Sequence, residues 1–206
     1  MIEILPIENN VGKYGLGNAE AFVRWRADIL MGEGVSRAQL NAFGVDDENV
    51  IDQYRQAHLQ KDAMAEEGHD FLGAFQDGSM VGAVETRLWT PKDEKAYRFP
   101  ILNTFVSRWI AVLESDRPKP QPIGIFALLA EKSNAQTEVF ESLLDHVTKD
   151  QDKTDLLLPL TAHHPALPVV AEYGFERTNK FARQYGALHQ LYIREGDEPT
   201  QIELAA

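Results

Sequence analysis

Two adjacent histidines, His163 and His164, follow one short apolar run of the sequence, and Glu131 follows another. An imidazole can accept a proton near neutral pH, and a carboxylate can do so through a water molecule. If both runs are parallel strands of one sheet, their carboxyl ends share the edge where α/β proteins gather ligands. We therefore predict Glu131, His163 and His164 as candidate general bases. The alternative interpretation is structural, with one histidine capping a helix and the other exposed to solvent.

Other reaction classes lack the residues that they need. The 206 residues contain no cysteine, which excludes disulfides, a thiolate nucleophile and cysteine metal sites. Two adjacent histidines without suitably spaced carboxylates do not predict a metal site, so we expect no metal. The glycine-rich stretch 9–17 is a candidate phosphate-binding loop, but it lacks the Gly-Lys-Ser/Thr ending of a nucleotide-binding loop, and the alternative interpretation is a flexible entry loop.

The candidate bases must be positioned by a strand–helix–strand unit. Residues 123–130 and 155–160 are short apolar runs typical of buried strands. Between them, apolar residues recur at helical spacing over 136–148, and Ser133 with Gln136 has capping-box spacing. Two buried strands joined by a helix predict a parallel, right-handed crossover.

Further elements are predicted on either side of this unit. We expect a strand over 2–7, a helix over 19–31 capped by Asn18, and a helix from 46 or 47 to 67. Asp77-Gly78 predicts a hairpin between 70–75 and 79–89. Pro165 suits the first turn of a helix and Gly174 the left-handed residue after it, with Phe175 packing on Val170. Residues 181–186 and 188–194 are expected to form a closing antiparallel pair.

The order of these elements resembles that of the GNAT acyltransferase superfamily. Two helices precede an antiparallel hairpin, and the sequence Glu172-Tyr173-Gly174-Phe175-Glu176 is similar to the end of the family's second crossover helix. The resemblance implies an α/β fold with a mixed central sheet and helices on both faces, formed by one domain over 1–206. Residues 90–121 are then an insertion before the fourth strand, and 196–206 a loose tail. Within the insertion, 105–113 fits a strand or a helix.

The resemblance also implies where coenzyme A binds. In that family, backbone N–H groups of a turn and helix N-terminus hold the pyrophosphate, which places this role on Asn134, Ala135, Gln136 and Thr137. The thioester meets backbone groups of the fourth strand, here Leu128 and Leu129. This chain departs from the family pattern, because Ala135 stands at the Arg/Gln position while Glu138 and Phe140 stand where two glycines belong. The phosphate-binding motif is therefore degenerate.

A second departure concerns the general acid. The family often has a tyrosine four residues before the glycine of the Gly-Phe sequence, and here that position is Val170. We expect Tyr173 to pack against the protein, and Tyr185 is a further candidate acid. A thiolate whose pKa is about 8.5 can leave without full protonation, so transfer does not require this tyrosine.

The function implied is an acyl-CoA-dependent N-acetyltransferase that uses acetyl-CoA and acts on a small amine or a peptide amine. The alternative is a catalytically degenerate binding or regulatory module. The net charge of −12 disfavours nucleic acid and membrane partners and attracts cationic amines, although acidity for solubility also explains it. We expect a cytoplasmic protein, and Phe105 and Trp109 are candidate anchors of a homodimer.

Overall fold

The computed structural model describes residues 1–7, 15–42, 70–90, 93, 121–149 and 151–196. Several predictions lie outside these residues. They are the helix over 46–67, nearly all of the insertion 90–121 with the dimer anchors Phe105 and Trp109, and the tail beyond 196.

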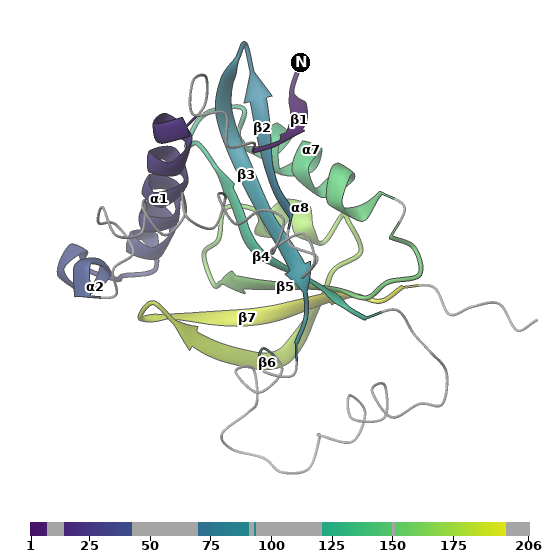
Figure 1. The fold of residues 1–206 in the computed structure, drawn as a ribbon. Helices are drawn as coiled ribbons and strands as arrows, with labels where there is room; N and C mark the ends of the chain where they lie inside the picture. The colour runs from purple at the N-terminus through teal and green to yellow at the C-terminus, as the bar shows by residue number, and fades with distance from the viewer. Residues whose placement is uncertain (8–14, 43–69, 91–92, 94–120, 150, 197–206) are drawn as a thin grey trace, which may run out of the picture.

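A mixed sheet forms the centre of the molecule (Figure 1). Its strand order is β1-β2-β3-β4-β5-β7-β6, and every neighbouring pair is antiparallel except β4 and β5, which are parallel. The strands are β1 (Glu3–Pro6), β2 (Asp70–Gln76), β3 (Ser79–Leu88), β4 (Ile123–Ala130), β5 (Leu156–Thr161), β6 (Glu176–Gln184) and β7 (Ala187–Arg194). The predicted mixed sheet and parallel crossover are confirmed.

Helices cover both faces of the sheet, as predicted (Figure 1). The described helices are α1 (Gly15–Gly32), α2 (Arg37–Ala42), α7 (Gln136–Thr148) and α8 (Leu167–Val170). On one face α7 and α8 pack in the largest buried cluster, where Phe140, Leu143 and Leu144 are fully buried. On the other face Phe22 and Trp25 of α1 pack over β2, β3 and β4. No described helix has the length and apolar character that crossing a membrane requires.

The helix starts differ from the predictions. Helix α1 begins at Gly15, so Asn18 lies inside it and is not its cap. The short helix α2 was not predicted, although Ser36 and Gln39 form a reciprocal capping box: the backbone N–H of Ser36 donates to Gln39 Oε1 at 2.9 Å and that of Gln39 to Ser36 Oγ at 3.3 Å. Only six residues long, α2 carries too little apolar periodicity to be recognised by that signal alone.

The predicted capping box at α7 is wrong. The N-cap is Ala135, without a side-chain cap, and Ser133 instead accepts the N–H of Ala135 on its hydroxyl at 3.3 Å. Gln136 reaches back to β4, where its Nε2 donates to the carbonyl of Ala130 at 3.3 Å. The side chain that was expected to cap α7 therefore ties this helix to the end of the neighbouring strand.

The second crossover helix is shorter than predicted. Helix α8 begins at Leu167 with Pro168 in its first turn, so Pro165 precedes the helix. Gly174 has φ +77, as predicted for the residue after this helix. Phe175 donates its N–H to the carbonyl of Val170 and shares the buried cluster with it, which confirms the predicted packing.

Two β-hairpins have two-residue turns whose residues have positive φ. The predicted hairpin between β2 and β3 turns on Asp77 (φ 51) and Gly78 (φ 78), which is the backbone pattern of a type I′ turn. Tyr185 (φ 48) and Gly186 (φ 83) make the same turn between β6 and β7. The closing antiparallel pair is confirmed, but β6 begins at Glu176, five residues earlier than predicted.

Candidate functional site

Strand β4 is distorted in its middle and separates from β5 beyond that point. Glu85 of β3 pairs with Ala127 of β4, but the next residue of β3, Thr86, pairs with Ile125, so Phe126 is an extra residue in β4. The ladder between β4 and β5 contains only two pairs, which end at Gly124. Both strands continue, and a gap therefore opens between their carboxyl-terminal halves. Bulges beside an opening of this kind are common next to active sites.

The pairing of β4 with β3 shows which backbone groups face the gap. The N–H of Glu131 donates to the carbonyl of Val81 on β3 at 2.8 Å. Because backbone groups alternate along an antiparallel ladder, those of Leu129 also face β3. The N–H and C=O groups of Leu128 and Ala130 therefore face the gap. Of the two β4 residues predicted to meet a thioester, only Leu128 presents its backbone there.

The two carbonyl groups on this edge have side-chain partners. Gln136 donates to the carbonyl of Ala130, as described above, and His164 forms a hydrogen bond with the backbone of Leu128. Within the described part of the chain, no hydrogen bond is recorded for the N–H groups of Leu128 and Ala130. These N–H groups can therefore donate to the carbonyl oxygens of a ligand in the gap.

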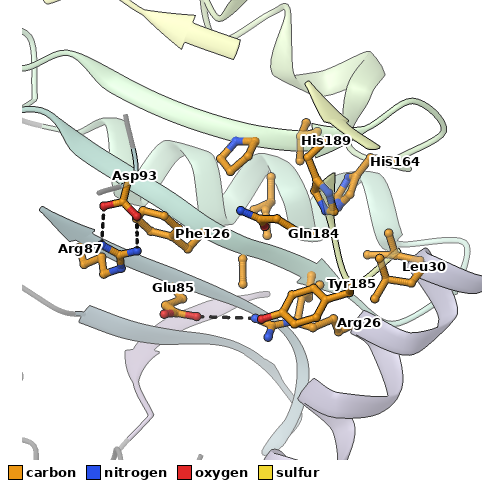
Figure 2. Close-up of a pocket in the computed structure, with 16 residues that line it drawn as sticks. Arg26, Leu30, Glu85, Arg87, Asp93, Phe126, His164, Gln184, Tyr185 and His189 are labelled. Atoms are coloured by element: carbon orange, nitrogen blue, oxygen red, sulfur yellow. Dashed lines mark hydrogen bonds and ion pairs between the residues drawn. The ribbon is translucent and has the colours of Figure 1, made fainter. Parts of the chain in front are cut away.

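A cavity of about 450 Å³ occupies the gap. Helix α1, strands β3, β4 and β5, and the β6–β7 hairpin all line it (Figure 2). Its ionisable lining consists of Arg26, Glu85, Arg87, Asp93, His164 and His189, with Tyr185 at the hairpin turn. This volume is within the range of small-molecule sites.

The structure separates the three predicted bases. Glu131 does not line the cavity; its carboxylate is half exposed and lies 4.0 Å from the guanidinium of Arg24. His163 is exposed, and its backbone N–H donates to the carboxylate of Glu33. Only His164 lines the cavity.

His164 is buried, and both of its ring nitrogens are engaged. Its Nδ1 accepts the N–H of Ala166 at 3.1 Å, so the other nitrogen carries the proton that is directed at Leu128. Burial lowers the pKa of His164 to about 3, and the charge of nearby His189 acts in the same direction, while the bond to Leu128 opposes both. His164 is neutral at physiological pH and joins the end of β5 to β4, in agreement with the structural interpretation.

His189 lines the cavity from β7 and was not among the predicted bases. It stands opposite Thr161 of β5, and among the described residues neither its Nδ1 nor the Thr161 hydroxyl, both buried, has a hydrogen-bond partner. Burial lowers the pKa of His189 and the charge of Arg26 adds to this, whereas the backbone of Ala187 and the carboxylate of Glu33 raise it. A neutral imidazole with a free nitrogen can accept a proton. One signal was present: His189 alternates in phase with Leu191 and Ile193, on the buried face of its strand.

Two arginine–carboxylate pairs line the same cavity. Arg87 binds Asp93 through two hydrogen bonds of 2.7 and 2.8 Å, and Asp93 also accepts from the backbone and hydroxyl of Thr90. Burial by itself would raise the pKa of Asp93, but the bonds from Arg87 and Thr90 hold it below its ordinary value. The guanidinium of Arg87 also lies 3.6 Å from the ring centroid of Phe126, the extra residue of β4.

The second pair is looser. The closest atoms of Arg26 and Glu85 are 3.7 Å apart, although both side chains are about four-fifths buried. The guanidinium of Arg26 lies 4.7 Å from the ring centroid of Phe22 and 5.8 Å from that of Tyr185. Within the described ranges, neither member of this pair has a recorded side-chain hydrogen bond.

The predicted phosphate-binding residues lie outside the cavity, at the N-terminus of α7. Asn134 and Thr137 are exposed, while Ala135 and Gln136 are partly buried. The N–H groups of Ala135 and Gln136 donate to the hydroxyl and carbonyl of Ser133, at 3.3 and 3.2 Å. Glu138 is exposed in the first turn. No group of three histidine, aspartate or glutamate side chains in the described ranges can hold a metal ion.

Neither a protein-family model nor a curated protein matches the sequence. Solved structures do match. A histone acetyltransferase HPA2 and related acetyltransferase from Corynebacterium glutamicum aligns over 97% of this chain and 98% of its own, at 15% identity and a TM-score of 0.55. The PaiA N-acetyltransferase of Thermoplasma acidophilum, crystallised with coenzyme A, aligns over 95% of this chain and 99% of its own, at 11% identity and a TM-score of 0.55. A GNAT-family acetyltransferase from Bacillus cereus aligns over 96% of this chain and 99% of its own, at 8% identity and a TM-score of 0.52.

Proposed function

We propose that this chain, which has the GNAT acyltransferase fold, transfers an acyl group from acetyl-CoA to an amine. One observation carries the proposal: β4 and β5 separate beyond Gly124, and the gap holds a cavity with the Leu128 backbone on one wall and His189 on another. Acyl transfer needs both groups, one to polarise the thioester carbonyl and one to take the proton of the amine.

The acyl donor would lie along the open edge of β4. An extended, amide-containing arm can pair with the N–H groups of Leu128 and Ala130 as an added strand does. The same N–H groups can stabilise the negative charge that develops on the thioester oxygen. The pyrophosphate would lie at the N-terminus of α7, over Asn134 to Thr137, because a helix N-terminus attracts anions.

The amine would attack from the side of His189. Its nitrogen forms a C–N bond with the acyl carbon, the C–S bond breaks, and coenzyme A leaves as a thiolate. His189 takes the proton that the amine nitrogen loses. His164 has no free nitrogen for this step and acts as a positioning residue, since it holds the backbone of Leu128.

Tyr173 does not supply the missing acid. Its hydroxyl donates to Asp145 and to the carbonyl of Glu141 on α7, at 2.9 and 3.1 Å. Burial and the bond to Asp145 raise the pKa of Tyr173 to about 12. The thiolate must therefore leave unprotonated or take its proton from another group.

Calorimetric titration with acetyl-CoA, followed by measurement of thiol release with a panel of primary amines, tests this function. We expect saturable binding and amine-dependent release of thiol. Absence of binding at millimolar acetyl-CoA would overturn the proposal and leave the binding or regulatory module. Binding without release of thiol for any amine would likewise contradict transferase activity.

A further inference from the structure

Arg26 is a partly buried cation with an unused hydrogen-bonding edge. The rings of Phe22 and Tyr185 lie near its guanidinium, at 4.7 and 5.8 Å between Cζ and ring centroid. In contacts of this kind the cation lies over the face of the ring, and the described residues show no side-chain hydrogen bond from Arg26. Among the described residues its one ionic partner is Glu85, at 3.7 Å, which is beyond hydrogen-bond distance. A side chain that is four-fifths buried thus retains most of its hydrogen-bonding capacity (Figure 2).

Glu85 has the complementary property. Its carboxylate is about as buried as Arg26 and has no second recorded partner in the described part of the chain. Arg87 and Asp93, in the same cavity, show what a saturated pair looks like: two short bonds, with Thr90 filling the remaining acceptor positions. The Arg26–Glu85 pair has room for one additional negative group and one additional positive group.

The position of the Arg26–Glu85 pair places a ligand's negative and positive groups at the proposed reaction site. Glu85 is the ladder partner of Ala127, the residue that precedes Leu128. Arg26 is close enough to His189 for its charge to act on the imidazole. A ligand bound to both side chains therefore lies between the β4 backbone that would hold the thioester and the histidine that would take the proton.

We propose that the acceptor is a small amino acid, whose carboxylate binds Arg26 and whose amine binds beside Glu85. This proposal rests on the proposed function for its reaction, but it concerns the acceptor alone. A simple cationic amine would bind Glu85 and deprive Arg26 of its counter-ion. An anion without an amine would bind Arg26 and deprive Glu85 of its counter-ion. A molecule with both charges a few bonds apart supplies a partner to each side chain, and the four charges then alternate in sign.

The test compares molecules that differ only in the carboxylate. Glycine and alanine are titrated against glycinamide and alaninamide by calorimetry, with the protein saturated with coenzyme A, and the same four compounds are used as acceptors with acetyl-CoA. We expect each amino acid to bind and to react at least about tenfold better than its amide, the scale of one charge-assisted hydrogen bond. Amides that bind and react as well as the acids would overturn the proposal.

Variants locate the carboxylate site. Arg26→Gln should remove the preference for the acid over the amide, and Arg26→Lys should restore part of it, since lysine keeps the charge but not the two-pronged geometry. The matched control is Arg24→Gln on the same helix, because Arg24 is exposed, with only a 4.0 Å contact to Glu131. A preference unchanged in Arg26→Gln would place the carboxylate elsewhere and refute the assignment.

The two proposals fail in different ways. If acetyl-CoA does not bind, the proposed function fails, while titration of the amino acids still tests Arg26 and Glu85. If acetyl-CoA binds and amines react but the amides equal the acids, the acceptor assignment fails and the proposed function stands.

Discussion

Two arginine–carboxylate pairs line one cavity, and they differ in how completely each satisfies its own hydrogen bonds. Arg87 and Asp93 form two bonds of 2.7 and 2.8 Å, and Thr90 fills the carboxylate's other positions. Arg26 and Glu85 are buried to a similar extent, yet lie 3.7 Å apart. Burial and charge are similar in the two pairs, and they differ in how many of their donors and acceptors are used.

The two histidines of the cavity repeat this contrast. His164 uses both nitrogens, one for Ala166 and one for Leu128, whereas Nδ1 of His189 is buried with no partner among the described residues. In the saturated groups, Arg87, Asp93 and His164, hydrogen bonds within the protein fill the polar positions of the side chain. The unsaturated groups, Arg26, Glu85 and His189, are those that a substrate would engage.

The largest expected effect is on the unsaturated histidine. His189→Gln should lower kcat by about 100-fold, the scale of general-base catalysis, because the imidazole would take the amine's proton. The control is His146→Gln, an exposed position on α7, which should keep the wild-type rate. Because the pKa of His189 is lowered, the loss of rate due to its protonation should occur below pH 6.5, and this loss should be absent from the variant. Full activity in His189→Gln would identify another base.

The next prediction compares how much each ion pair contributes to the free energy of unfolding. Asp93→Asn should lower the free energy of unfolding by about 2 kcal/mol, because it leaves the partly buried Arg87 without its carboxylate. Glu85→Gln should cost less, about 1 kcal/mol, because the contact that it removes is long and forms no hydrogen bond, although it too leaves a partly buried arginine unpaired. Urea unfolding of both variants checks this. Equal losses would contradict the distinction between the pairs.

A comparable effect on stability is expected from the saturated histidine as pH is lowered. The pKa of His164 is about 3 in the folded protein and near 6.5 when unfolded, so between these values the unfolded chain binds a proton that the folded chain does not. Its contribution to stability is complete above pH 6.5 and falls by about 1.4 kcal/mol per pH unit as pH drops toward 3. Urea unfolding from pH 6.5 to 4.5 should show a shallower slope for His164→Gln than for the wild type. Identical slopes would show that His164 is not buried in its neutral form.

The smallest effect concerns the first turn of α7, outside the cavity. Glu138→Gln removes a carboxylate from the proposed pyrophosphate site and should strengthen acetyl-CoA binding about threefold, the scale of one exposed charge near a helix terminus. Glu176→Gln, an exposed change at the start of β6, is the control for net charge. Unchanged affinity in Glu138→Gln would argue against pyrophosphate at this terminus.

Periodicity predicted the elements whose burial is regular. The sequence predicted the apolar strand β4, the largely apolar strand β5, the apolar stripe of α7 and the glycine turns at Gly78 and Gly174, because each has a side-chain pattern tied to its backbone. The start of β6 was missed because residues 176–180 form the outer edge of the sheet, where polar side chains do not alternate with buried ones. The capping box of α2 was a readable signal that was not used.

The cavity could not be predicted in the same way. Arg26, Glu85 and His189 come from α1, β3 and β7, and only the sheet order brings them together. The bulge at Phe126 and the end of the β4–β5 ladder are properties of backbone hydrogen bonding, which no residue type encodes. The predicted bases Glu131 and His163 follow the correct strands, but strand ends mark an edge of the sheet and not the direction of a side chain.

The extra residue in β4 sets the phase of the whole strand. Side chains alternate faces with a period of two, so one inserted residue shifts everything after it by half a period. Ile125, Leu128 and Ala130 consequently share the face of α7, although Ile125 and Leu128 are three positions apart. Ala127 and Leu129 face α1. Phe126 therefore offsets the side-chain alternation between the half of β4 that pairs with β5 and the half that borders the gap. A strand with an uninterrupted period could not present both halves correctly to the two helix layers.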